Sequence, residues 1–221
     1  MVEKAVSRCS ARTVNIEILI MAAGQAKRFG SPKQLAMIGN RPMLQGVVEE
    51  AMDTGCRVYV ALGAHRQQIL AVALGQLPSE SIIEVNGWAE GLGQSIAESV
   101  SARVSTNPDL DGVLILLGDQ PLLRSEDLAR LLACARRNPE RIIASCYDKG
   151  VGDDGNSGSG KRAGVPAYFP RSTFPDLMAL SGDTGAKRIV RSRPHDTIAF
   201  GQLLVDVDVP EDLAFCSGAL P

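Results

Sequence analysis

Short apolar runs alternate along this chain with segments in which apolar residues recur at helical spacing. Five of the runs are rich in Ile, Leu and Val and predict strands, at 16–22, 57–63, 81–85, 112–118 and 141–147. Four segments with helical spacing predict helices, at 42–55, 65–75, 93–104 and 125–137. Strands that alternate with helices predict an α/β domain whose mostly parallel sheet is covered by helices on both faces.

Local signals add detail to two of these helices. Gly55 is expected to end the first helix, since glycine readily takes the left-handed conformation found there. Ser125 is expected to cap the N-terminus of the last helix, with Glu126 and Asp127 in its first turn.

The alternation stops after Tyr147. Residues 149–164 are polar and glycine-rich, without an apolar period, and they predict a mobile loop. Shorter elements are expected beyond it: the run 165–169, a helix from Ser172, a helix at 184–192, and a strand at 205–209 before a short helix with Pro210 in its first turn.

Composition narrows the class of protein. The chain has 221 residues and a net charge of -2, which gives no electrostatic reason to expect nucleic acid as a partner. No apolar run is long enough to cross a bilayer, so no membrane partner is expected. We expect a flexible tail at 1–14 and a single domain at 15–221. Five dispersed cysteines and two histidines argue against disulfides and zinc and favour the cytoplasm.

The loop after the first predicted strand, MAAGQAKRFGSPKQL at 21–35, combines small residues with cations. Ala22, Ala23 and Gly24 would let a ligand approach the backbone, whose N–H groups can bind an anion. Arg28 offers a bidentate fork for phosphate oxygens, and Lys33 offers a point charge. Spacing excludes both a Walker A loop and a G-x-G-x-x-G motif. The alternative is a surface loop whose cations are solvated.

Carboxylates also follow one predicted strand and lie within another. Asp119 comes directly after the run 112–118, where it suits a Mg²⁺ ligand or a turn. Asp206 and Asp208 would lie on one side of the strand at 205–209, as metal ligands or as a solvated edge. Ser95 opens another predicted helix, where it could contact a base or cap that helix, and Trp88 before it could be core or lid.

The loop AAGQAKRFGSPKQL resembles the signature A-A-G-x-S-x-R-M-G-x-x-K-x-L of nucleotidyltransferases that attach a nucleotide to the molybdenum cofactor. Further stretches follow in that family's order, namely NGWAEGLGQSI, GDQPLL, GVPAYF, GDTGAKRIV and DVDVPEDL. The resemblance covers about Ile16 to Phe215 and is greatest to the cytidylyltransferases, which have AAG where guanylyltransferases have AGG. It implies a three-layer Rossmann-like nucleotidyltransferase fold. Two departures are Ala26, for the family's serine, and Phe29, for its methionine.

The resemblance also implies roles for individual residues. It assigns catalysis to Arg28, Lys33 and Asp119. Nucleotide binding is assigned to Ala22, Ala23, Gly24, Arg28, Lys33, Ser95 and Asp119, and Mg²⁺ binding to Asp119, Asp208 and Asp206. The acceptor side is assigned to Gly164, Pro166, Gly182 and Asp183.

The reaction that follows is transfer of CMP from CTP to the terminal phosphate of molybdopterin, with release of pyrophosphate. No histidine or cysteine nucleophile stands among these residues, which favours direct transfer without a covalent enzyme intermediate. Three alternatives stay open: GTP as the donor, a sugar or polyol phosphate as the acceptor, and a non-catalytic accessory protein that hands the cofactor to a molybdoenzyme. Lys161 and Arg162 could hold an anionic acceptor or be solvated.

Overall fold

The central sheet of the computed structural model, which describes residues 13–148, 161–200 and 206–219, has seven strands in the order β5-β4-β1-β6-β8-β7-β9. β1 (Ile16–Met21) pairs in parallel with both β4 (Arg57–Leu62) and β6 (Gly112–Leu117). β5 (Ile82–Glu84) extends this half in parallel beside β4. The carboxyl ends of these strands therefore meet at one edge of the sheet, where α/β proteins bind ligands.

The other half of the sheet contains its antiparallel strand. β8 (Lys161–Pro170) runs antiparallel between β6 and β7 (Ile142–Asp148), and β9 (His195–Ala199) pairs in parallel with β7. β9 was not among the expected strands. The predicted α/β class with a mostly parallel sheet, and its three-layer Rossmann-like architecture, are confirmed.

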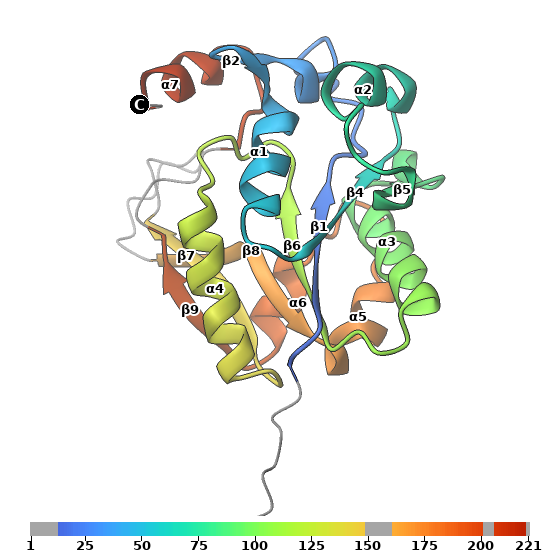
Figure 1. Cartoon of the computed structure of the whole chain (residues 1–221), viewed down its shortest axis with the longest axis vertical. Helices are drawn as coiled ribbons and strands as arrows, with labels where there is room; N and C mark the ends of the chain where they lie inside the picture. The colour runs from blue at the N-terminus through green and yellow to red at the C-terminus, as the bar shows by residue number, and fades with distance from the viewer. Residues whose placement is uncertain (1–12, 149–160, 201–205, 220–221) are drawn as a thin grey trace, which may run out of the picture.

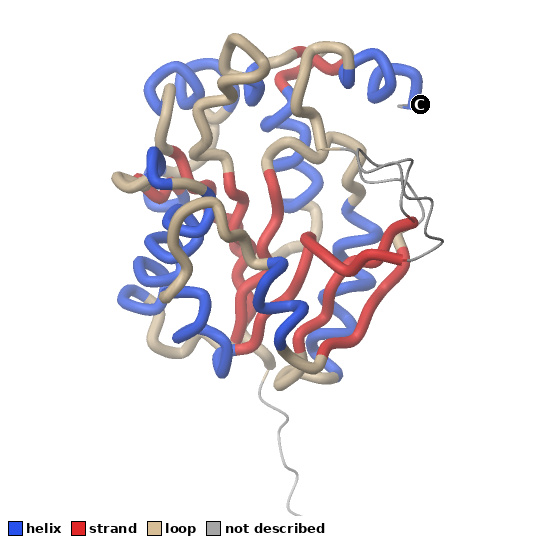
Figure 2. The backbone as a smooth tube through the Cα atoms, turned by 180° about the vertical axis from the view of Figure 1, so that it is seen from behind, coloured by secondary structure: helices blue, strands red, loops and turns tan. Residues whose placement is uncertain are grey.

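Helices cover both faces of the sheet (Figure 1; Figure 2 gives the view from behind). On one face lie α1 (Met43–Met52), α2 (Arg66–Ala73) and α4 (Ser125–Arg137). On the other lie α3 (Leu92–Thr106), α5 (Phe174–Met178) and α6 (Lys187–Ser192). A small hairpin of β2 (Met37–Ile38) and β3 (Arg41–Pro42) packs beside α7 (Asp212–Ala219).

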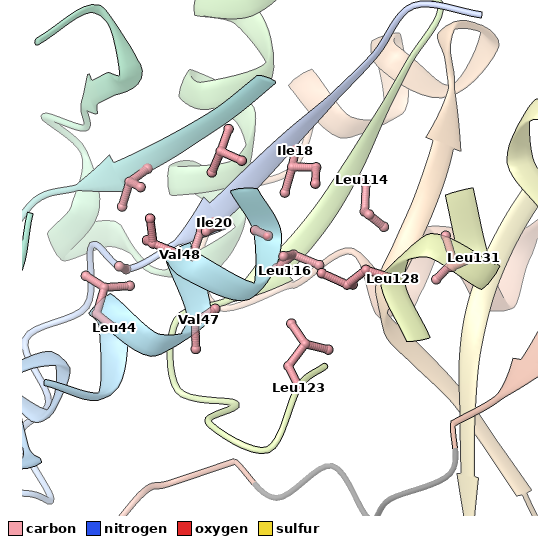
Figure 3. Close-up of a cluster of buried hydrophobic side chains, with 14 of the residues drawn as sticks. Ile18, Ile20, Leu44, Val47, Val48, Leu114, Leu116, Leu123, Leu128 and Leu131 are labelled. Carbon is pink, nitrogen blue, oxygen red and sulfur yellow. The ribbon is translucent and has the colours of Figure 1, made fainter. Parts of the chain in front are cut away.

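Side chains alternate between the two faces of β1 and therefore belong to two separate hydrophobic cores. Ile18 and Ile20 point toward α1 and α4, whereas Leu19 and Met21 belong to the core under α3. Figure 3 shows the first core, in which side chains of β1 and β6 meet Leu44, Val47 and Val48 of α1 and Leu128 and Leu131 of α4. β1 is thereby buried on both faces, which explains why all its residues but Glu17 are apolar.

Glu17 is the one charged side chain of β1, and it is fully buried. Arg103 of α3 donates to its carboxylate from Nε at 2.9 Å and from Nη2 at 3.1 Å, and Asn107 Nδ2 donates at 2.9 Å. The Arg103 guanidinium also lies 3.7 Å from the ring centroid of Tyr59. These contacts supply the pairing that a buried carboxylate requires.

Two expectations about helix ends meet different outcomes. α1 ends at Met52, and Gly55 has a φ of 74° with its N–H donating to Met52 O, as expected of a terminating glycine. The prediction that Ser125 caps the last helix is wrong, because α4 begins at Ser125 itself and Arg124 occupies the N-cap position. The backbone N–H of Ser125 donates to Glu50 Oε2 at 2.7 Å. A carboxylate of α1 thus binds one of the N–H groups that have no partner within α4.

Two further expectations need correction. The loop expected at 149–164 is wrong at its end, because Lys161 to Gly164 pair with β7 in an antiparallel ladder that needs no apolar period. The strand expected at 205–209 is wrong for its described residues, since 206–208 form no strand. Val207 N–H donates to Asp119 O and Val207 O accepts from Lys33 Nζ, so this backbone is bound by a loop and a side chain.

Some expectations concern residues outside the ranges that the structure describes. Most of the predicted tail at 1–14, and residues 149–160 of the predicted loop, lie outside the described residues. Among the helices of residues 13–148, 161–200 and 206–219, none combines the length and apolar character that a bilayer crossing requires.

Candidate active site

A cavity of about 650 Å³ opens at the carboxyl ends of β1 and β6. Its walls include all but one of the residues predicted for nucleotide and metal binding, Asp206 being the exception: Ala22, Ala23, Gly24, Arg28, Lys33, Ser95, Asp119 and Asp208. The structure thus brings together side chains from loops that are far apart in the sequence. The volume falls within the range of small-molecule sites.

Lys33 lies at the centre of the charged groups of this cavity. Its Nζ donates to Asp119 Oδ2 at 2.7 Å, to Asp208 Oδ1 at 3.2 Å and to Val207 O at 2.9 Å. Arg28 Nη2 donates to the other carboxylate oxygen of Asp208 at 2.9 Å. Arg28 and Lys33 of the first loop are therefore paired with carboxylates from two other loops.

Burial and charge together set the protonation of this pair. Burial disfavours the charge of Lys33, but the carboxylates of Asp119 and Asp208 outweigh that effect and raise its pKa. Burial raises the pKa of Asp119, and the nearby Lys33 ammonium offsets this only in part. Asp119 Oδ1 is buried and has no hydrogen-bond partner among the described residues. A second positive group at this oxygen would stabilise the ionised form.

Residues 206–212 are held by hydrogen bonds among themselves and with Gln120. The N–H groups of Val209 and Asp208 donate to Asp212 Oδ2 at 3.0 and 2.8 Å, and they lower the pKa of Asp212. Gln120 Nε2 donates to Asp206 Oδ1 at 2.9 Å. Asp206 is exposed and is not among the cavity-lining residues, but its charge acts on Asp119 and contributes to the raised pKa of that carboxyl group.

The acceptor-side residues divide into two groups. Asp183 lines the cavity, and Gly182 O accepts a hydrogen bond from Gly93 N–H at 2.8 Å beside it. Gly164 and Pro166 lie within β8 and are not among the lining residues; Gly164 O accepts from the buried Ser145 hydroxyl. Only part of the predicted acceptor set is therefore next to the predicted nucleotide set.

Sequence reasoning missed several residues of the cavity wall. Gln25, Ala89, Gly91 and Leu92 line it, and so does the buried Gln34. The available signal for Gln34 was its position directly after Lys33 in the signature loop. Trp88, left open as core or lid, also lines the cavity and is partly exposed.

Gly93 of α3 packs closely against the backbone of residues 181–184, and a substitution can test this contact. A Cβ at this position would lie 2.6 Å from Thr184 O and 2.7 Å from Ser181 O, both backbone atoms that cannot rotate away. Gly93→Ala is therefore expected to lower the free energy of unfolding by about 1–3 kcal/mol. Denaturant unfolding measures it, with Gly75→Ala as the control, because the nearest atom there is 3.6 Å away. Equal stability of the two variants would contradict the tight contact.

Comparison with known proteins places this site in a family. The MobA-like NTP transferase domain family matches residues 18–198, which span both the first loop and the sheet. The chain belongs to this family. The predicted enzyme class, a nucleotidyltransferase, is confirmed at this level.

This NTP transferase also matches curated proteins over part of their length. The bifunctional protein GlmU of Xanthomonas campestris pv. campestris strain 8004 is 30% identical over 161 residues, covering 69% of this chain and 33% of that protein. This chain thus spans about a third of the length of the curated relatives it matches.

Solved structures confirm the fold. Rv0371c from Mycobacterium tuberculosis H37Rv superposes with a TM-score of 0.74 at 24% identity, covering 94% of this chain and 100% of that one. The same protein has also been solved in complex with manganese. CMP:2-keto-3-deoxy-manno-octonic acid synthetase complexed with CTP gives a TM-score of 0.67 at 15% identity, covering 93% of this chain and 97% of that one.

Proposed function

We propose that this NTP transferase is a Mg²⁺-dependent cytidylyltransferase that transfers CMP from CTP to the terminal phosphate of molybdopterin and releases pyrophosphate. The observation that carries the proposal is the convergence of Lys33 and Arg28 with Asp119 and Asp208 in one cavity. This arrangement combines groups that bind phosphate with groups that bind a divalent cation. The signature loop that supplies the cations resembles that of the cytidylyltransferases.

The carboxylates fit a divalent cation. Asp119 and Asp208 both lie within hydrogen-bond distance of Lys33 Nζ, and Asp119 has a buried oxygen without a partner among the described residues. Mg²⁺ commonly takes only one or two protein carboxylates and completes its shell with phosphate oxygens and water. When bound, the ion would neutralise charge on the phosphate oxygens.

Lys33 and Arg28 would bind the triphosphate. In the structure their charges are balanced by Asp119 and Asp208. A triphosphate offers both side chains competing oxygens, and the raised pKa of Lys33 keeps it protonated for this exchange. In line attack by the acceptor phosphate on the α-phosphorus breaks the bond to the β-phosphate oxygen. The leaving pyrophosphate is then stabilised by these two cations.

Ser95 would lie near the base. Its side chain is almost fully buried, and its hydroxyl donates to Gly91 O at 3.2 Å, so its oxygen is left to accept a hydrogen bond. An exocyclic amino group, such as that of cytosine, is a suitable donor. Asp183, on the same cavity wall, supports placing the acceptor beside the nucleotide.

The test is pyrophosphate release with Mg²⁺ and molybdopterin, comparing CTP, GTP, ATP and UTP. We expect selective release with CTP, and we expect Asp119→Asn to lower the rate at limiting Mg²⁺ by at least about 10-fold. Selectivity for GTP would overturn the base assignment. Release only with a sugar or polyol phosphate, identified by mass spectrometry of the product, would overturn the acceptor. Nucleotide binding without turnover would favour the accessory-protein alternative.

A further inference from the structure

Gln34 occupies an unusual position beside the proposed phosphate site. It belongs to the 3-10 helix η1 (Lys33–Leu35), and its side chain is 3% exposed at the cavity wall. Its Nε2 donates to Ala22 O and to Gly24 O, each at 3.0 Å. Both acceptors are carbonyls of the turn that follows β1.

Packing does not explain this side chain. Its Oε1 is buried without a hydrogen-bond partner among residues 13–148, 161–200 and 206–219. A buried polar atom left unsatisfied is unfavourable, so the need to fill space would by itself favour an apolar side chain of the same size. What Gln34 supplies instead is a pair of donors with a defined separation.

These two hydrogen bonds orient the peptide groups of the turn. In a trans peptide the C=O of one residue and the N–H of the next point in opposite directions. Because Ala22 O and Gly24 O face Gln34, the N–H groups of Ala23 and Gln25 face away from it. Within the described chain, neither N–H donates to another backbone group outside the regular elements. Free N–H groups that face one way form an anion-binding concavity.

We propose that Gln34 is a positioning residue that holds the turn after β1 in its anion-binding conformation. The inference rests on the proposed function, since it assigns the turn to the triphosphate. One short helix then has two tasks: Lys33 contributes a charge to the cavity, and Gln34 fixes the backbone donors beside it. In this role, the side-chain amide of Gln34 does not need to contact the reacting phosphorus.

The experiment measures binding of inorganic tripolyphosphate by calorimetry, without nucleotide base or acceptor. We expect Gln34→Met, which keeps the size and removes both donors, to weaken binding about 10-fold. In turnover, the same variant should raise the KM for the nucleotide and leave the KM for the acceptor unchanged. Gln45→Met is the control, because Gln45 is bonded to Glu49 within α1 and does not line the cavity.

The outcomes separate this inference from the function on which it rests. If wild-type protein binds tripolyphosphate and Gln34→Met binds it equally tightly, the positioning role is wrong and the proposed function stands. If wild-type protein does not bind tripolyphosphate, the phosphate site fails and this inference fails with it. Should Gln34→Met not fold, Gln34→Glu has the same shape and can donate to at most one of the two carbonyls, and its unaltered affinity would equally refute the role.

Discussion

Lys33→Met is expected to lower the rate of nucleotidyl transfer by at least about 100-fold, as removal of a preorganised charge-stabilising group does in other enzymes. Two effects combine. The variant loses a cation for the leaving pyrophosphate, and it leaves Asp119 and Asp208 facing each other without the ammonium that lies 2.7 and 3.2 Å from them. Both effects act at the transferring phosphate. Steady-state pyrophosphate release at saturating nucleotide measures the loss.

The matched control for Lys33→Met is Lys27→Met. Lys27 belongs to the same loop and lines the same cavity, but its side chain is exposed. The control therefore removes an equal charge from nearly the same place, and we expect a loss of less than about 10-fold, since an exposed charge is screened. Equal losses in the two variants would mean that the net charge of the loop matters and the pairing of Lys33 does not.

Arg103→Met is expected to lower the free energy of unfolding by about 3–5 kcal/mol, because it strands the buried Glu17 carboxylate without its ion-pair partner. For a chain of this size that corresponds to a drop in melting temperature of roughly 10 °C. The Asn107 amide that remains cannot replace a bidentate guanidinium. Thermal and denaturant unfolding measure the change.

Two further variants test this reasoning. Arg141 makes a similar bidentate pair with Asp196, at 2.8 Å for both bonds, but both side chains are more than two-fifths exposed. Arg141→Met should therefore cost only about 0–1 kcal/mol. The double variant Glu17→Leu with Arg103→Met should regain most of the lost stability, because no buried charge remains. If it were as unstable as Arg103→Met alone, the stranded carboxylate would not be the cause.

Elements that are buried on both faces or have clear helical spacing could be predicted from the sequence. β1, β4 and β6 came from continuous apolar runs, and α4 came from a periodicity that matches its observed bounds, Ser125–Arg137. Elements that are stabilised by partners distant in the sequence could not be predicted in this way. β9 is partly exposed and exists because it pairs with β7, and the segment 161–164 is a strand because β7 lies beside it.

The candidate site shows the same division. The residues that carry its charge were identifiable from the sequence: Arg28 and Lys33 lie in the signature loop, Asp119 follows a predicted strand, and Asp208 alternates with valines in another. Their pairing was not, because Lys33 contacts Asp208 across 175 residues of chain. Gln34 was missed, because its role depends on two carbonyls that only the folded turn brings within 3.0 Å.

By itself, the sequence determined the fold class, the order of the main elements and the kinds of charged group at the ends of the strands. Those features depend on local periodicity and on the side-chain types, which a linear pattern records. Only the tertiary structure decided which cation faces which carboxylate and that Glu17 lies buried against Arg103. It also decided that Asp208 reaches the cavity from a loop. These outcomes depend on contacts between segments remote in sequence, whose geometry exists only when the sheet and its two helical layers are assembled.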